Sequence, residues 1–190
     1  MVHPNAYFVN ILQSGALKAL GNVLGQCIIA SRGGNSCPWT TIQWTSVLVF
    51  SSWAAINAPL LLLWNQFLDE KFPSVLSSID DNKEYKDNKK KEEYSYSNVI
   101  VKVILTESIF SVFINTLLIL YMSFSQGHTQ RALISYRIQK DLPNILANSI
   151  KLWPLITFIS YVYMAPGKRV LFRSAIGVLW TVYLSMVSLG

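Results

Sequence analysis

Charged residues are scarce in this chain of 190 residues. Lys, Arg, Asp and Glu together make up 14% of it and hydrophobic residues 52%, whereas soluble domains usually carry about 25% charged residues. The few charges are also unevenly placed, because eight of the ten acidic residues lie between positions 64 and 98. A water-soluble fold would spread its charges over every surface helix. The sequence therefore predicts an integral membrane protein.

Metal-binding residues are equally few. The chain has two cysteines, Cys27 and Cys37, and two histidines, His3 and His128. No CxxC or paired-histidine spacing occurs, and a structural zinc site needs about four ligands. We expect no metal and no cofactor, and we interpret both cysteines as structural or incidental.

Catalytic signatures are missing as well. The sequence contains no GxSxG, HExxH, P-loop or GxGxxG pattern, and His128 has no aspartate within several residues. We therefore predict that the protein is not an enzyme. The N-terminal residues also show no signal-peptide pattern, so insertion is expected to use internal signals.

Long apolar segments are what the chain does contain. A spanning helix needs about 20 mostly apolar residues, and open sheets cannot satisfy their edges in lipid. The sequence predicts an all-α, multi-span transmembrane helix bundle that forms a single membrane domain over residues 1–190. Four spans are expected, with a polar stretch at 131–141 before the last of them: 7–30, 41–63, 99–124 and 145–164. The stretch 170–189 could be a fifth span or a helix packed against the others.

A charged, partly flexible loop outside the membrane is predicted at 65–98. Its second part, 80–98, is rich in Asn, Lys and Glu and should be solvated. A surface loop and a partner-binding segment both fit this composition. Lys and Arg number nine on the side of this loop and four on the other, which predicts that the N-terminus and the loop face the cytosol or a mitochondrial matrix.

Polar residues in the first span allow two interpretations. Gly21 and Gly25 have the spacing that lets two helices approach closely. Lys18, Asn22 and Gln26 lie on or beside that face and could instead line a lumen. Lys18 is about three turns into the span, so it must reach the interface or find a partner.

The third span carries a polar stripe. Glu107, Ser111 and Asn115 recur at i, i+4 and i+8 and so face one direction. Lys102 is a further candidate for a pore-lining or intramembrane polar residue, although it lies off this stripe by about 140° on helical geometry. A carboxylate there should face protein or water, either in an interhelical hydrogen bond or ion pair or in the polar wall of a solute path.

Several motifs, in order along the chain, resemble one known family. They are the run from Ser14 to Gln26, Ala58-Pro59, Trp64, Leu68-Asp69, Pro73, Lys102, Trp153-Pro154, Ala165-Pro166, Arg169, Trp180 and Tyr183-Leu184-Ser185. This set is similar to the signatures of the peroxisomal-membrane-protein/Mpv family, small multi-span proteins of peroxisomal and inner mitochondrial membranes. The chain departs from the usual patterns at Asn22, Asn65, Thr106-Glu107, Thr157 and Ser160-Tyr161. It resembles a diverged, fungal member.

The resemblance implies a role and a location. It implies a passive channel or permeability factor for small hydrophilic solutes in the peroxisomal membrane, or alternatively in the mitochondrial inner membrane. A homo-oligomer is expected, because one small bundle encloses little space. The alternative is a scaffold or sorting protein that self-associates through Gly21 and Gly25 and recruits partners through 80–98 in peroxisome biogenesis or inheritance. The expected partners are lipid, further copies and a protein at that loop, with no nucleic acid.

Overall fold

The computed structural model describes residues 4–32, 42–76 and 93–187, and these ranges are almost entirely helical. The elements are α1 (Pro4–Arg32), α2 (Trp44–Lys71), β1 (Val75–Leu76), β2 (Glu93–Tyr94), α3 (Tyr96–Leu105), a π-helical turn η2 (Thr106–Phe110), α4 (Ser111–Ser125), α5 (Arg131–Ser149), α6 (Trp153–Tyr163), a 3₁₀ turn η3 (Pro166–Lys168) and α7 (Arg169–Val187). The predicted all-helical class is confirmed.

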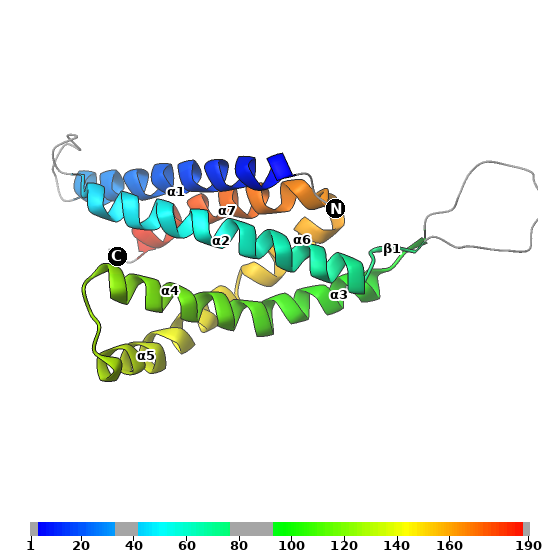
Figure 1. Cartoon of the computed structure of the whole chain (residues 1–190). Coiled ribbons are helices and arrows are strands. Elements are labelled where there is room, and N and C mark those ends of the chain that lie inside the picture. The colour runs from blue at the N-terminus through cyan, green and yellow to red at the C-terminus, as the bar shows by residue number, and fades with distance from the viewer. Residues whose placement is uncertain (1–3, 33–41, 77–92, 188–190) are drawn as a thin grey trace, which may run out of the picture.

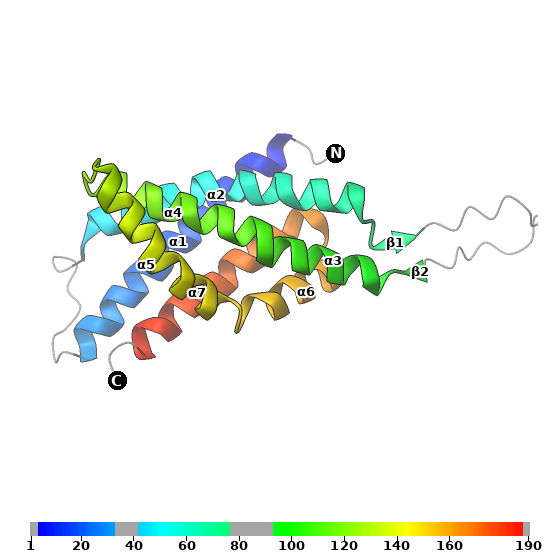
Figure 2. The same ribbon diagram turned by 90° about the horizontal axis from the view of Figure 1, so that it is seen from below.

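Helix α1 packs along both α2 and α7, and α3 continues through η2 into α4 on the other side of α2 (Figures 1 and 2). Helices α1 and α7 run in the same direction. The start of α1, the β1–β2 ribbon and η3 lie at one end of the bundle, and the end of α7 lies at the other (Figure 1). The prediction that the N-terminus and the middle loop face the same side of the membrane concerns residues outside the described ranges and stays a prediction.

Two helices are long and apolar enough to cross a membrane, namely α2 and the continuous helix Tyr96–Ser125. The count is three if the pair α5 and α6, which is bent by 54°, is taken as one span. This count applies to the described residues and does not include α1 or α7. Four spans plus a fifth therefore stays a prediction, although each predicted segment contains helix.

The predicted fourth span needs a correction. A single segment was expected at 145–164, but the helix breaks between Ser149 and Trp153. Pro154 explains the break, because it cannot donate to the carbonyl of Ile150 and is instead accommodated in the first turn of α6. The polar stretch 131–141 is itself helical and belongs to α5, none of whose residues is buried.

Both ends of the range predicted as a loop, 65–98, are helical. Helix α2 continues to Lys71, and α3 begins at Tyr96 with Ser95 as its cap, whose Oγ accepts the backbone N–H of Asn98 at 3.4 Å. The antiparallel pairs Val75–Tyr94 and Leu76–Glu93 then join the two helix ends. Residues 77–92, which include most of the proposed partner-binding segment, lie outside the described residues.

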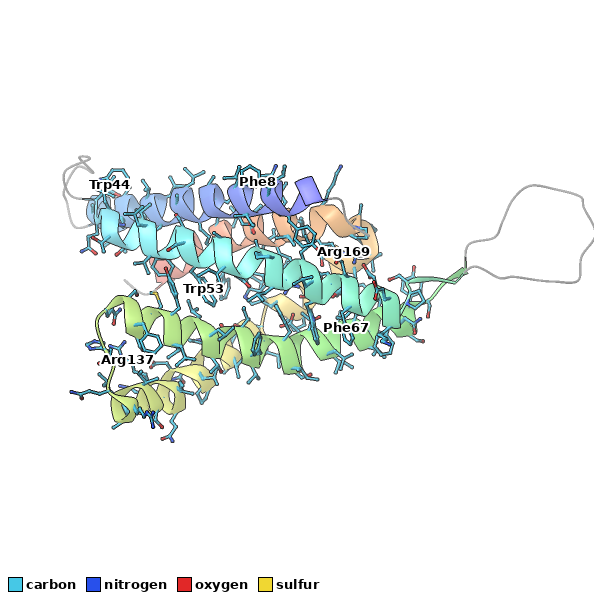
Figure 3. All side chains as sticks on the ribbon, in the orientation of Figure 1. Phe8, Trp44, Trp53, Phe67, Arg137 and Arg169 are labelled. Atoms are coloured by element: carbon cyan, nitrogen blue, oxygen red, sulfur yellow. The ribbon has the colours of Figure 1, made fainter. Side chains whose placement is uncertain are left out.

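The bundle exposes many large apolar side chains and buries several polar ones beside its apolar core. Phe8, Trp44 and Phe67 (Figure 3) are 64%, 50% and 48% exposed. The buried residues include Lys102, Asn65, Thr106, Ser123, Thr157 and Ser160. Such an apolar exterior would be a liability in water and is what a lipid-facing surface requires.

Gly21 packs at the contact between α1 and α7. A Cβ built on it would lie 3.2 Å from Cγ2 and 3.3 Å from Cγ1 of Val178. Gly21 and Gly25 are both buried. The predicted close-packing role of Gly21 is thus fulfilled within the chain. Within the chain α7 covers Gly21, and self-association through Gly21 and Gly25 stays a prediction.

Gly21→Val is expected to destabilise the protein by about 1–3 kcal/mol, because overpacking displaces neighbouring groups. The free energy of unfolding in detergent measures the effect. Adding Val178→Ala should recover part of the loss, since it removes the γ-methyl groups that the new side chain meets. A double variant no more stable than Gly21→Val would contradict this packing.

Candidate functional site

An ion cluster lies where the ends of four helices meet. Asp69, near the end of α2, accepts from Lys102 Nζ at 2.6 Å through Oδ1 and from Arg169 Nη1 at 2.5 Å through Oδ2. Lys102 on α3 also donates to Ser74 Oγ at 2.7 Å. The Lys102 side chain is fully buried, whereas that of Asp69 is 25% exposed. One carboxylate therefore serves two cations from different helices.

Tyr161 on α6 completes the cluster. Its ring centroid lies 5.1 Å from Lys102 Nζ and 4.8 Å from Arg169 Cζ, within the range of cation–π attraction. Its hydroxyl donates to Asn65 Oδ1 at 2.9 Å. Arg169 Nε also donates to the carbonyls of Ser160 and Met164. The cluster thus joins α2, α3, α6 and α7.

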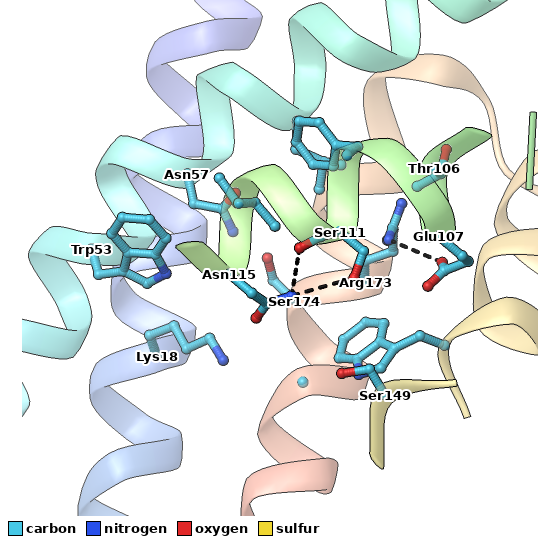
Figure 4. Close-up of a pocket in the computed structure, with 15 residues that line it drawn as sticks. Lys18, Trp53, Asn57, Thr106, Glu107, Ser111, Asn115, Ser149, Arg173 and Ser174 are labelled. Atoms are coloured by element: carbon cyan, nitrogen blue, oxygen red, sulfur yellow. Dashed lines mark hydrogen bonds and ion pairs between the residues drawn. The ribbon is translucent and has the colours of Figure 1, made fainter. Parts of the chain in front are cut away.

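A polar cavity of about 220 Å³ lies deeper in the bundle (Figure 4). Helices α1, α2, α4, α6 and α7 and the turn η2 contribute to its wall, with Ser149 at the end of α5. Its polar lining is Lys18, Asn57, Thr106, Glu107, Ser111, Asn115, Ser149, Arg173 and Ser174. Trp53, Leu61, Phe110, Ile114 and Trp153 supply the apolar part.

Glu107 and Arg173 carry opposite charges on the cavity wall. Thr157 donates to Glu107 Oε1 at 2.6 Å, and Arg173 Nη2 lies 3.9 Å from the same oxygen (Figure 4). The Arg173 guanidinium also lies 5.9 Å from the Trp153 ring centroid. Its Nη1 is buried and has no hydrogen-bond partner in the part of the chain that the structure describes.

The π-helical turn places Thr106 and Glu107 between the two sites. Thr106 Oγ1 accepts from Trp64 Nε1 at 3.1 Å and lies 3.4 Å from the Tyr161 hydroxyl, while Glu107 faces the cavity. Such single π turns interrupt the regular progression of side chains around a helix and are frequent at functional sites. Here the turn connects the ion cluster to the cavity.

Lys18 reaches the cavity from α1. A Cβ built on Gly177 would lie 3.4 Å from its Nζ, so the ammonium group lies against α7 at a residue without a side chain. Among the described residues, no hydrogen bond or ion pair joins Lys18 to an acceptor. A charge at mid-bilayer costs roughly 2.5–3.5 kcal/mol on insertion scales, so this position needs a polar environment.

The structure separates the residues that were predicted to line a pore. Lys18, Glu107, Ser111 and Asn115 all line the cavity, and Asn115 Nδ2 donates to the Ser111 carbonyl at 2.8 Å. Lys102 lies in the ion cluster instead. Gln26 Nε2 donates to Asn22 Oδ1 at 2.7 Å and Gln26 Oε1 accepts from the Gln43 N–H at 2.7 Å, so that pair links α1 to the start of α2.

The remaining motif residues shape the helices. Pro59 lies inside α2, Pro154 is in the first turn of α6 and Pro166 opens η3. Arg169 is in the ion cluster, Trp64 binds Thr106, Trp153 lines the cavity and Trp180 is on α7.

Sequence reasoning missed Asn57, Arg173 and Ser174 as cavity residues. Arg173 lies one helical turn after Arg169, a spacing that puts both on one face. Asn57 is a polar amide within the most apolar segment, which is itself a signal for an interior-facing residue. Across ranges 4–32, 42–76 and 93–187, no three His, Cys, Asp or Glu residues come together as metal ligands.

Comparison with known proteins identifies relatives over most of the chain. The sequence model described as the Mpv17 / PMP22 family matches residues 123–185. PXMP2/4 family protein 3 of Dictyostelium discoideum is 26% identical over 177 residues, which are 93% of this chain and 81% of that protein. PXMP2/4 family protein 4 of the same organism is 22% identical over 134 residues, covering 70% of this chain and 62% of that protein.

A third relative is an uncharacterized protein of Schizosaccharomyces pombe, 27% identical over 94 residues, or 50% of this chain and 42% of that protein. No solved structure gives a significant match. A fungal origin stays a prediction. The family match spans the end of α4 through α7, and the matches to the Dictyostelium proteins extend over most of the helical bundle. The chain, with two or three candidate membrane spans, is thus similar to the Mpv17 / PMP22 family over residues 123–185 and to a PXMP2/4 family protein over most of its length.

Proposed function

We propose that the protein is a passive pathway for small hydrophilic solutes across the peroxisomal membrane. The observation that carries this proposal is the polar cavity inside a bundle whose exterior is apolar. Intramembrane charges are costly and usually mark a substrate path or a water-filled space. Three charged side chains, Lys18, Glu107 and Arg173, face this cavity.

The cavity sets the size of the solute. Its volume of about 220 Å³ equals about seven water molecules at about 30 Å³ each. Selection would rest on the size of the cavity and on the hydrogen-bonding groups that replace the solute's water shell. No nucleophile or bound metal is needed for such a role.

We further propose that the protein works in this membrane as a homo-oligomer. The family resemblance supports the peroxisomal membrane, with the mitochondrial inner membrane as the alternative. A homo-oligomer would bring several such cavities together. The number of copies can be established by cross-linking the purified protein in a mild detergent and measuring the mass of the product.

Ser111→Phe is expected to reduce solute flux about tenfold, which corresponds to about 1.4 kcal/mol in the barrier, because the ring would fill the cavity. The measurement is swelling of proteoliposomes in erythritol, a neutral polyol. Ser108→Phe is the matched control. It lies in the same turn, but its side chain is exposed and donates to the Ile104 carbonyl at 2.6 Å.

Two results would contradict the proposal. Wild-type proteoliposomes could swell no faster than empty ones. Alternatively, both phenylalanine variants could reduce flux equally, which would show that the cavity is not the path.

A further inference from the structure

The charges on the cavity wall do not cancel. Lys18 and Arg173 contribute two positive charges, and Glu107 contributes one negative charge. We propose that the cavity binds a small organic monoanion whose carboxylate is held between Lys18 and Arg173. This assignment names the solute class of the pathway proposed above and rests on that function for its transport aspect.

Arg173 has unused donors. Its contact with Glu107 is long, at 3.9 Å, and the Glu107 oxygen on that side already accepts from Thr157 at 2.6 Å. Nη1 of Arg173 is buried and unpartnered among the described residues. A guanidinium carries five N–H donors in a planar fork that matches a carboxylate. A small rotation of the guanidinium would present this unsatisfied donor to an anion in the cavity.

Lys18 supplies the second positive charge from a different helix. Its ammonium group lies against Gly177, which follows Arg173 by one turn of α7. Arg173 and Gly177 are at positions i and i+4 of α7 and so share a helix face. The Lys18 ammonium group therefore lies on the same face of α7 as Arg173, one turn farther along the helix. The missing side chain at Gly177 leaves room for the ammonium group.

The rest of the lining favours an organic acid over an inorganic ion. Ser111, Asn115 and Ser174 can hydrogen-bond a hydroxyl, while Trp53 and Trp153 offer apolar surface to a short carbon chain. A monoanion brings the net charge of the occupied cavity to zero, whereas a dianion leaves it negative. Lactate, a hydroxylated monocarboxylate, is therefore a suitable probe.

The test measures permeability and binding on the full-length protein. Reversal potentials in planar bilayers under a sodium lactate gradient give the lactate-to-sodium permeability ratio. We expect a ratio above one for the wild type, a fall of about five- to tenfold for Lys18→Gln, and a rise for Glu107→Gln, because each variant removes one charge near the path. Lys18→Arg should keep the preference. Lys140→Gln, an exposed residue of α5 outside the cavity, should leave it unchanged.

Binding without transport is measured separately. Lactate should raise the unfolding temperature of the wild type in detergent and should not do so for Lys18→Gln, because a ligand that binds only the folded state stabilises it. Erythritol swelling, measured in parallel, reports the pathway itself.

These readouts separate the two proposals. If erythritol enters but lactate is neither preferred nor stabilising, the anion site is overturned and the pathway stands. If no solute enters above empty vesicles but lactate stabilises the wild type and not Lys18→Gln, the anion site stands and the pathway is overturned. Equal stabilisation by chloride and lactate would overturn the assignment to an organic acid.

Discussion

Replacing Asp69 by asparagine is expected to destabilise the protein by about 3–5 kcal/mol, the usual effect of removing one partner of a buried ion pair. Asp69 is the carboxylate bound by both Lys102 and Arg169. Lys102 is fully buried and Arg169 is 6% exposed, so the variant leaves two cations without their counter-charge. The free energy of unfolding in detergent measures the loss.

Glu70→Gln is the matched control, because it removes a carboxylate from the next residue, which is exposed. It should change stability by less than about 0.5 kcal/mol, as surface substitutions usually do. Adding Lys102→Met to Asp69→Asn should recover part of the loss, because an apolar side chain needs no counter-charge. If Asp69→Asn and Glu70→Gln proved equally mild, the cluster would not stabilise the fold.

Tyr161→Leu is expected to cost about 3–4 kcal/mol, since it replaces a buried aromatic ring that contacts two cations. Tyr161 is 2% exposed and lies against both Lys102 and Arg169. Tyr161→Phe keeps the ring and loses the contacts of the hydroxyl with Asn65 and Thr106, so it should cost about 1 kcal/mol.

Unfolding of the two Tyr161 variants under identical detergent conditions gives the comparison. The difference between the two losses of stability separates the contribution of the ring from that of the hydroxyl. Equal losses for phenylalanine and leucine would show that the hydroxyl network with Asn65 and Thr106 stabilises this site, and not the contact of the ring with the cations.

Local pattern was enough to predict the helices and one wall of the cavity. The lengths of the apolar segments predict α1, α2, α7 and the long α3–α4 helix, because a helix that crosses lipid needs about 20 mostly apolar residues. The stripe of Glu107, Ser111 and Asn115 follows from helical periodicity alone, and the structure brings all three to the same cavity.

Contacts between distant segments could not be predicted in this way. Lys102 pairs with Asp69 across 33 positions, and Arg169 with Asp69 across 100. The position of Lys102 in the sequence does not indicate whether its side chain lines a pore or belongs to an ion cluster. The break before Pro154 was obscured because the apolar run continues through it, and the helical α5 was obscured because its composition is polar.

The parallel packing of α1 against α7 has a consequence for biogenesis. Ser14 and Ser174 lie 3.1 Å apart although 160 positions separate them, and ordering contacts of such long range is slow. During synthesis, α1 is complete long before α7 has been translated. Its polar face, with Ser14 and Lys18, must meanwhile be satisfied by water, by lipid headgroups or by an insertion factor. The cavity can therefore form only late in assembly, when α7 docks and completes its wall.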